Sequence, residues 1–125
     1  MQIERQALRD VIGDASRLAF DSIPPEYLTD ALGRLHGQAE ALAFPLSTEE
    51  VSGVLRYAHE HQIPVTPRGA GTNLVGSTVP LQGGIILDLS RMNRILELDR
   101  DTLTVTVEPG ILLQDLQAYV EGEGL

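Results

Sequence analysis

The sequence contains no cysteine among its 125 residues, which excludes disulfides, thiol catalysis and thiolate metal sites. Long apolar runs are also missing, since none approaches the roughly 18 to 20 residues that span a bilayer. The first residues, MQIERQALRDVIG, carry charges where a signal peptide would have its apolar core. We therefore predict an unsecreted protein without transmembrane segments. Its expected location is the cytoplasm, with peripheral association at the inner membrane as an alternative.

Positive charge is scarce as well. Nine basic residues against 18 acidic ones give a formal net charge of -9 at pH 7. This balance lacks the basic surface that nucleic acids or anionic membranes require, so both partners are disfavoured. An anionic ligand would have to be held against this net charge by local backbone dipoles, which directs attention to glycine-rich turns.

The composition is otherwise that of one globular domain. Apolar residues make up 42% of the chain, and the 12 glycines and 7 prolines cluster in loops between periodic segments rather than in a low-complexity tract. We therefore expect an ordered chain with a core of its own.

Helical periodicity predicts two helices in the first half of the chain. Residues 3–12 have apolar side chains at helical spacing and stop at Gly13, a typical C-cap. Residues 14–37 have a weak pattern and are expected to be irregular, with at most a turn of helix. A second helix begins at a capping box formed by Ser47 and Glu50. Its predicted apolar stripe consists of Val51, Val54, Leu55 and Ala58.

Short apolar runs predict the strands. Residues 41–45 and the segment IPVTP flank the second helix, so they form a strand, helix, strand unit with parallel strands. GGIILDLS follows as a third strand, and ILELDRDTLTVTVEPG alternates in period two around a turn at residues 99–101, which indicates a hairpin. A final helix is predicted with Leu112, Leu113, Leu116 and Val120 on one face. The predicted fold class is α/β, a small sheet with parallel core strands plus a hairpin, flanked by helices.

The segment TPRGAGTNLVGST contains three glycines directly after a predicted strand. A dinucleotide-binding G-x-G-x-x-G pattern fits Gly69 and Gly71, but its third position is Leu74. A phosphate-binding G-x-x-x-x-G-K-[ST] pattern fits Gly71 and Gly76, but Ser77 replaces the lysine that reaches the terminal phosphates. A kinase or NTPase is therefore disfavoured.

Small and polar residues remain in this loop, and they allow two interpretations. Gly69, Ala70 and Gly71 would let backbone N–H groups approach a diphosphate, and side-chain donors are available at Thr72, Asn73, Ser77 and Thr78. Hydrogen bonds to a charged acceptor contribute about 1.5 to 3 kcal/mol each, so a few of them would outweigh a screened net charge. Alternatively, the glycines only build a tight turn.

Other candidates are weaker. Arg68 could contact a phosphate or the edge of a flavin, or it could pair with a carboxylate at the rim of a site. His59 and His61 would point to different faces of a helix, so we interpret them as solvated and predict no metal site. Asp99 and Asp101 fit a solvated turn. No pair of nucleophile and base is apparent, and we predict no catalytic residue in this chain.

The run IPVTPRGAGTNLVGSTVPLQGGIILDLSRMNRILELDRDTLTVTVEPGILLQDL resembles the flavin-binding segment of the FAD-linked oxidases of the vanillyl-alcohol oxidase and p-cresol methylhydroxylase superfamily. The likeness is greatest to the glycolate oxidase flavoprotein subunit and the D-lactate dehydrogenases. It is specific because the PRGAGT loop, GGIILDLSRMNRI and VEPG occur in this order, and it covers the chain from about Phe44 onwards.

The resemblance implies an FAD site. The cofactor-binding residues that it implies are Pro67, Arg68, Gly69, Ala70, Gly71, Thr72, Asn73, Gly76, Ser77, Pro109 and Gly110. Some relatives of this kind hold FAD through a covalent bond to a histidine in this loop. This chain has Thr72 and Asn73 there instead, so we expect its flavin to be bound non-covalently.

The resemblance also implies a division of the chain and a function. Residues 1–40 would form an N-terminal helical arm, and residues 41–125 the first lobe of an FAD-binding domain of the p-cresol methylhydroxylase type, without its second lobe and substrate-cap domain. The expected parent is a 2-hydroxy acid oxidase or dehydrogenase that passes electrons to a quinone or a partner subunit, and the 125 residues alone are not expected to turn over. The alternative is a stand-alone module that binds a nucleotide or another diphosphate without redox activity.

Overall fold

The structure is a computed structural model and describes residues 3–29, 33, 36–69, 80 and 82–125. Its centre is a four-stranded sheet in the order β1-β2-β4-β3, which comprises Leu18–Ala19, Ala41–Ala43, Ile85–Asp88 and Val65–Arg68. Strands β2, β4 and β3 are parallel, and β1 pairs antiparallel with β2. The predicted parallel core is therefore confirmed, with β4 inserted between the two strands of the strand, helix, strand unit.

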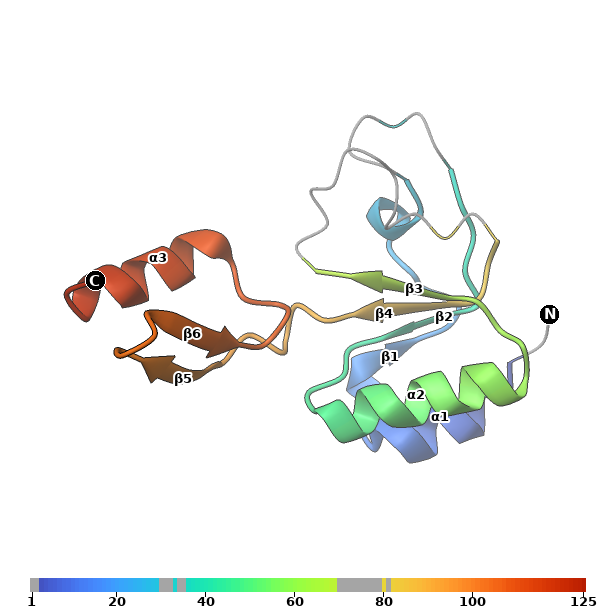
Figure 1. The fold of residues 1–125 in the computed structure, drawn as a ribbon. Coiled ribbons are helices and arrows are strands. Elements are labelled where there is room, and N and C mark those ends of the chain that lie inside the picture. Colours follow the sequence, from blue (N-terminus) through green and yellow to red (C-terminus); the bar gives the residue numbers. More distant parts are fainter. Residues whose placement is uncertain (1–2, 30–32, 34–35, 70–79, 81) are drawn as a thin grey trace.

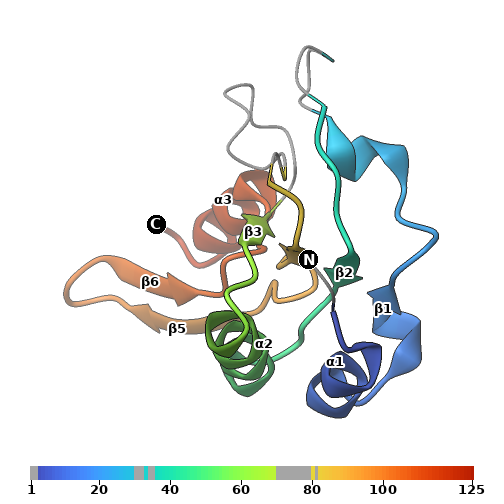
Figure 2. The ribbon, with the colours of Figure 1, turned by 90° about the vertical axis from the view of Figure 1, so that its right-hand side faces the viewer.

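Two helices cover one face of this sheet. Helix α1 (Arg5–Ile12) and helix α2 (Thr48–Glu60) lie together below the strands in Figures 1 and 2. The predicted end of the first helix is confirmed, because Gly13 is left-handed at φ 75° and its N–H donates to the carbonyl of Arg9. Gly53 allows the two helices to approach closely, since a Cβ there would lie 2.7 Å from a methyl group of Val11.

The core lies between these helices and alternate residues of the strands. Successive strand residues point to opposite faces, and Ile85 and Leu87 of β4 belong to the cluster that packs against the helices. The cluster consists of Leu8, Ile12, Ala41, Ala43, Val54, Tyr57, Ala58, Ile63, Ile85 and Leu87. Asp88 lies on the other face of the sheet, towards a short 3-10 helix, η2 (Pro25–Leu28).

Helix α2 begins as predicted, but its buried stripe differs. The Ser47 hydroxyl accepts a hydrogen bond from the Glu50 N–H at 3.2 Å, while the Glu50 carboxylate accepts from the N–H of Leu46 rather than that of Ser47. Leu55 was expected in the apolar stripe, and this was wrong: it is 45% exposed, and Tyr57 is buried instead. Leu55 lies about 100° around the helix from Val54, away from the face that meets α1.

The segment before β2 contains more structure than its weak pattern predicts. It includes a 3-10 turn η1 (Ala15–Arg17), the two-residue strand β1 and the helix η2. The side chain of Asp14 accepts a hydrogen bond from the N–H of Ser16 and begins η1. A two-residue strand is too short for sequence alternation to reveal.

The last third of the chain projects from the sheet (Figure 1). The predicted hairpin is confirmed as β5 (Ile95–Asp99) and β6 (Thr104–Val107), and helix α3 (Leu113–Gly122) follows. No residue of α3 is fully buried. On its predicted apolar face, Leu116 and Val120 are partly buried, whereas Leu112 and Leu113 are exposed. An apolar hollow of about 350 Å³ lies between the hairpin and the C-terminal end of the chain, and it is lined by Leu98, Leu103, Thr104, Val105, Val120 and Leu125.

None of the helices in the described part of the chain has the length and hydropathy that crossing a bilayer requires.

Candidate cofactor site

The carboxyl ends of the parallel strands lie at one edge of the sheet. Arg68 ends β3 opposite Asp88, which ends β4, and the two are register partners. Ligands of open α/β sheets bind outside this edge, where the loops after the strands begin. The predicted glycine-rich loop therefore starts at the position where such a sheet offers a binding site.

The described part of the predicted site consists of five residues. Pro67 and Arg68 belong to β3, Gly69 follows them, and Pro109 and Gly110 follow β6. The structure brings these two groups together, because a Cβ on Gly69 would lie 3.9 Å from the carbonyl oxygen of Pro109. The other predicted residues, Ala70, Gly71, Thr72, Asn73, Gly76 and Ser77, lie outside the described residues.

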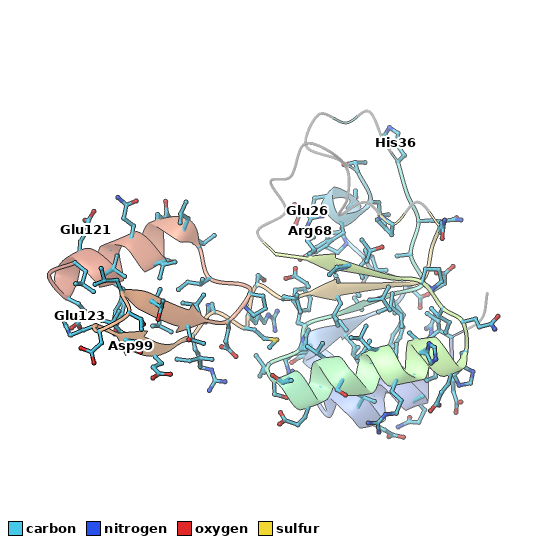
Figure 3. The ribbon with its side chains drawn as sticks, in the orientation of Figure 1. Glu26, His36, Arg68, Asp99, Glu121 and Glu123 are labelled. Carbon is cyan, nitrogen blue, oxygen red and sulfur yellow. The ribbon has the colours of Figure 1, made fainter. Side chains whose placement is uncertain are left out.

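Arg68 is held by the segment before β2. Its guanidinium carbon lies 4.5 Å from the centre of the Tyr27 ring, and its Nη1 donates a hydrogen bond of 3.1 Å to the carbonyl oxygen of Glu26. Figure 3 shows Glu26 and Arg68 beside each other at the edge of the sheet. Among the residues that the structure describes, no carboxylate forms a salt bridge with Arg68. The interpretation of Arg68 as one half of a rim ion pair thus gains no support here.

Tyr27 is itself fixed from the sheet. Its hydroxyl donates a hydrogen bond of 2.6 Å to Oδ2 of Asp88, and Oδ1 of Asp88 accepts from the N–H of Ser90 at 2.8 Å. Asp88 is only 3% exposed. Burial, and then the hydrogen bond to Asp88, raise the pKa of Tyr27 to about 12, so the hydroxyl remains a donor at neutral pH.

A second arginine lies at the same edge of the sheet. The guanidinium of Arg91 lies 4.1 Å from the centre of the Phe44 ring, and Phe44 meets Tyr27 edge to face with ring centres 6.3 Å apart. Two cations thus stand on neighbouring rings in a chain of strongly negative net charge. Sequence reasoning missed Tyr27, Phe44, Asp88 and Arg91, because no local spacing connects them.

The two described glycines of the site differ in what an added side chain would meet. A Cβ on Gly110 would lie 2.0 Å from the carbonyl oxygen of Leu89, so packing of the two backbones already requires glycine there. Against the described residues, a Cβ on Gly69 would come no closer than 3.9 Å, to the carbonyl oxygen of Pro109, and Gly69 has no positive φ. The described part of the fold therefore does not require glycine at position 69, whereas close approach of a ligand to the backbone would.

An ion pair supports the segment around Pro109. Glu108 accepts hydrogen bonds from the backbone N–H and Nε of Arg94, both at 2.9 Å, and from its Nη2 at 3.1 Å. These bonds from Arg94 lower the pKa of Glu108. Glu108 therefore stays ionised and holds the start of β5 against the end of β6, which makes it a structural carboxylate.

The predicted metal and histidine assignments concern the surface of α2. Within the described ranges, no group of three His, Asp or Glu side chains is placed to hold a metal ion. His59 and His61 are exposed, and the His61 ring packs on Tyr57 with ring centres 4.6 Å apart. His59 lies in the last turn of α2 and His61 caps its C-terminal end, and α2 covers the opposite face of the sheet from η2.

The arrangement at the sheet edge fits the anionic part of a dinucleotide. It offers a cation in a fixed position, a glycine that the described residues do not require and the start of a glycine-rich loop. Such groups bind a diphosphate by charge and hydrogen bonds.

The fold and sequence have known counterparts. The structure of p-cresol methylhydroxylase with bound substrate superposes with a TM-score of 0.80 at 28% identity and covers 96% of this chain and 24% of that protein. Glycolate oxidase subunit GlcD of Bacillus subtilis is 42% identical over 99 residues, which are 79% of this chain and 21% of the relative. A D-lactate dehydrogenase of Anaerostipes hadrus is 40% identical over 110 residues, which are 86% of this chain and 23% of that protein.

The fold thus defines an FAD-binding α/β unit of the p-cresol methylhydroxylase type, as predicted. A model of the family described as FAD binding domain matches residues 39–125, and the chain belongs to this family. Its cofactor is FAD. The chain spans about a fifth to a quarter of the length of the relatives it matches, namely 21%, 23% and 24%.

Proposed function

We propose that this chain forms the first lobe of the FAD-binding domain of a longer flavoprotein that oxidises a 2-hydroxy acid such as glycolate or D-lactate. The names of the two sequence relatives support this substrate class, and the lengths of the relatives support a longer parent. On this proposal, residues 41–125 are the lobe itself and residues 1–40 an N-terminal arm packed against it. The 125 residues alone bind the diphosphate side of FAD and do not turn over.

The observation that carries the proposal is the pairing of Arg68 with Gly69 at the carboxyl end of β3. Arg68 presents a guanidinium that its contacts hold in place, and among the described residues only the carbonyl oxygen of Pro109 lies within 4 Å of a Cβ built on Gly69. We assign to Arg68 the neutralisation of diphosphate charge. The N–H groups after Gly69 and the side chains of Thr72 and Asn73 complete the predicted cradle, in which the flavin is held without a covalent bond.

The roles of protein and cofactor are separate. FAD, when bound, supplies the hydride acceptor for the α-carbon of the hydroxy acid. The residues of this chain bind and orient the cofactor and compensate its charge in a chain of net charge -9. The substrate-handling groups and the contact to a quinone or an electron-transfer partner lie in other parts of the proposed parent. We place the protein in the cytoplasm, with peripheral association at the inner membrane as the alternative.

The test is cofactor binding by the full-length protein, with Gly71→Val as the variant. A side chain at this position would fill the backbone approach to the diphosphate, so FAD affinity should fall at least tenfold while the far-UV circular dichroism stays unchanged. Gly122→Ala is the matched control, because a Cβ there meets nothing within 4 Å, and it should leave the affinity unchanged.

Two results would count against the proposal. Unchanged FAD affinity in Gly71→Val would remove the predicted cradle from the site. A colourless full-length protein that is stabilised by ADP but not by FAD would support a nucleotide-binding module without redox activity.

A further inference from the structure

The orientation of Arg68 depends on a residue far away in the sequence. An arginine side chain at a strand end loses rotamer entropy when it is fixed. This loss weakens ligand binding unless the side chain is already fixed in the free protein. The described structure has already fixed Arg68 by the Tyr27 ring and the Glu26 carbonyl oxygen. Both contacts come from η2, outside the matched residues 39–125.

The hydrogen bonds between described residues engage only one nitrogen of the Arg68 guanidinium. Nη1 is engaged with Glu26 at 3.1 Å, and the guanidinium has five N–H donors in one plane. The Tyr27 ring lies 4.5 Å from the guanidinium carbon. An arginine held in this way can donate to a planar or tetrahedral anion.

Two residues fix the Tyr27 ring in turn. Its hydroxyl donates to Asp88 at 2.6 Å, and Asp88 is itself held by the N–H of Ser90. The ring also packs edge to face with the Phe44 ring. Asp88 ends β4 directly opposite Arg68 on β3. The sheet therefore holds both partners of the Arg68–Tyr27 contact. It holds Arg68 through the backbone of β3, and it holds Tyr27 through the side chain of Asp88.

We propose that Tyr27 is a positioning residue for the cofactor diphosphate, because it holds the guanidinium of Arg68 in the orientation in which Arg68 binds the diphosphate. This inference rests on the proposed function. It extends the site beyond the matched family region to η2, and it makes the N-terminal arm a part of cofactor binding. Tyr27 does not touch the cofactor; its effect passes through Arg68.

The test is a double-mutant cycle in the full-length protein, with FAD and riboflavin as probes. Riboflavin carries the flavin ring without the diphosphate, so it reports any general damage to the site. Tyr27→Leu removes the ring and should weaken FAD binding about tenfold, with riboflavin affinity unchanged. Tyr27→Phe keeps the ring but loses the bond to Asp88, so it should weaken FAD binding about threefold. Should Tyr27→Leu fail to fold, Tyr27→Phe carries the test.

Arg68→Gln provides the second arm of the cycle. It should weaken FAD binding at least tenfold, and adding Tyr27→Leu in the Arg68→Gln background should then weaken it less than twofold further. Phe20→Leu is the matched control, because this ring also carries arginines, with Arg5 and Arg9 at 4.9 and 5.5 Å, but on the side of α1. It should leave both affinities unchanged.

The possible outcomes distinguish a failure of the inference on Tyr27 from a failure of the proposed function. Two results would make Tyr27 a structural residue only and overturn the inference. One is an equal loss of affinity for FAD and riboflavin in Tyr27→Leu. The other is that Tyr27→Leu weakens FAD binding as much in the Arg68→Gln background as in the wild type. An FAD-binding protein in which Arg68→Gln has no effect would also overturn it, together with the role assigned to Arg68 in the proposed function, while FAD binding by the chain would stand. A wild-type protein that binds no FAD would overturn the proposed function itself.

Discussion

Arg17 connects the segment before β1 to the first turn of α2, and replacing it with methionine tests whether this connection stabilises the fold. Its Nη1 and Nη2 donate to the two oxygens of Glu50 at 2.8 and 2.9 Å. They also donate to the carbonyl oxygens of Phe44 and Ile12 at 3.0 and 2.8 Å. Arg17→Met keeps an apolar stem of similar length and removes all four hydrogen bonds.

The expected loss follows from the burial of the pair. Breaking a buried ion pair costs about 3 to 5 kcal/mol, whereas an exposed pair contributes at most about 1 kcal/mol. The side chains of Arg17 and Glu50 are 11% and 17% exposed, which is closer to the buried case, although water still reaches the carboxylate. We therefore expect Arg17→Met to lower the free energy of unfolding by about 2 to 3 kcal/mol.

Glu50→Gln separates the charge from the shape of the acceptor. The amide oxygen still accepts from the N–H of Leu46, which donates to Glu50 at 2.7 Å, so this variant should lose only about 1 kcal/mol. The double variant of Arg17→Met and Glu50→Gln should lose about 1 kcal/mol less than the sum of the single losses, because both changes remove the same contact.

Acid should abolish the contribution of the pair. The hydrogen bonds from Arg17 lower the pKa of Glu50, and burial opposes them. A carboxyl with a lowered folded-state pKa stabilises the fold above its unfolded-state pKa of about 4.3. This contribution is lost as the pH falls through the folded-state value. The difference in free energy of unfolding between wild type and Arg17→Met should therefore be constant near neutral pH and decrease below about pH 4.

Urea denaturation followed by far-UV circular dichroism measures all four proteins of the cycle at neutral and acid pH. A loss below about 0.5 kcal/mol for Arg17→Met, the size of an exposed pair, would refute the reasoning. The same holds for a difference that does not change in acid. The first result would show that the four contacts do not stabilise the folded state, and the second that the ionised carboxylate of Glu50 does not.

Further predictions concern single side chains and can be checked by denaturation. Gly84→Ala should lower the free energy of unfolding by more than about 2 kcal/mol, because φ is +93° and a Cβ would lie 2.1 Å from a backbone carbonyl oxygen. Gly13→Ala, at φ +75° with nothing within 4 Å, should lose only about 1 to 2 kcal/mol of backbone strain. Gly122→Ala should gain about 0.5 to 1 kcal/mol, since this helical position has free space. Val54→Ala should lose about 1 to 3 kcal/mol because Val54 is fully buried, and a loss no larger than that of Leu55→Ala would contradict its place in the core.

The helices and most of the strands could be predicted because their signals are local. Gly13 ends α1 through its own backbone conformation, and Ser47 begins α2 through a hydrogen bond to a residue three positions away. The alternation of β5 and β6 likewise needs only neighbouring residues. Each of these signals is complete within a few residues of the sequence.

The remaining features depend on residues far apart in the chain. Strand β1 exists because Leu18 and Ala19 pair with β2, and periodicity cannot indicate a pairing of two residues. Leu55 fits the helical stripe as well as Tyr57 does. Only the position of α1 decides which of them is buried, and the Tyr57 hydroxyl accepts from the N–H of Glu4, 53 residues away.

The candidate site divides in the same way. Arg68 and Gly69 belong to a contiguous motif and could be predicted from it. Tyr27 and Asp88 are 61 residues apart, and nothing near Tyr27 in the sequence indicates that it meets the end of β4. The residues that fix Arg68 therefore became visible only in the fold.

The insertion of β4 between β2 and β3 also has a consequence for biosynthesis. A ribosome makes the chain from its first residue, so the central strand of the sheet, Ile85–Asp88, is made after both of its neighbours. Until it arrives, β2 and β3 each present an unpaired strand edge, the kind of surface through which nascent chains associate. The sheet can close only when residue 88 has left the exit tunnel, and the parts that hold Arg68 in place become complete in the same step.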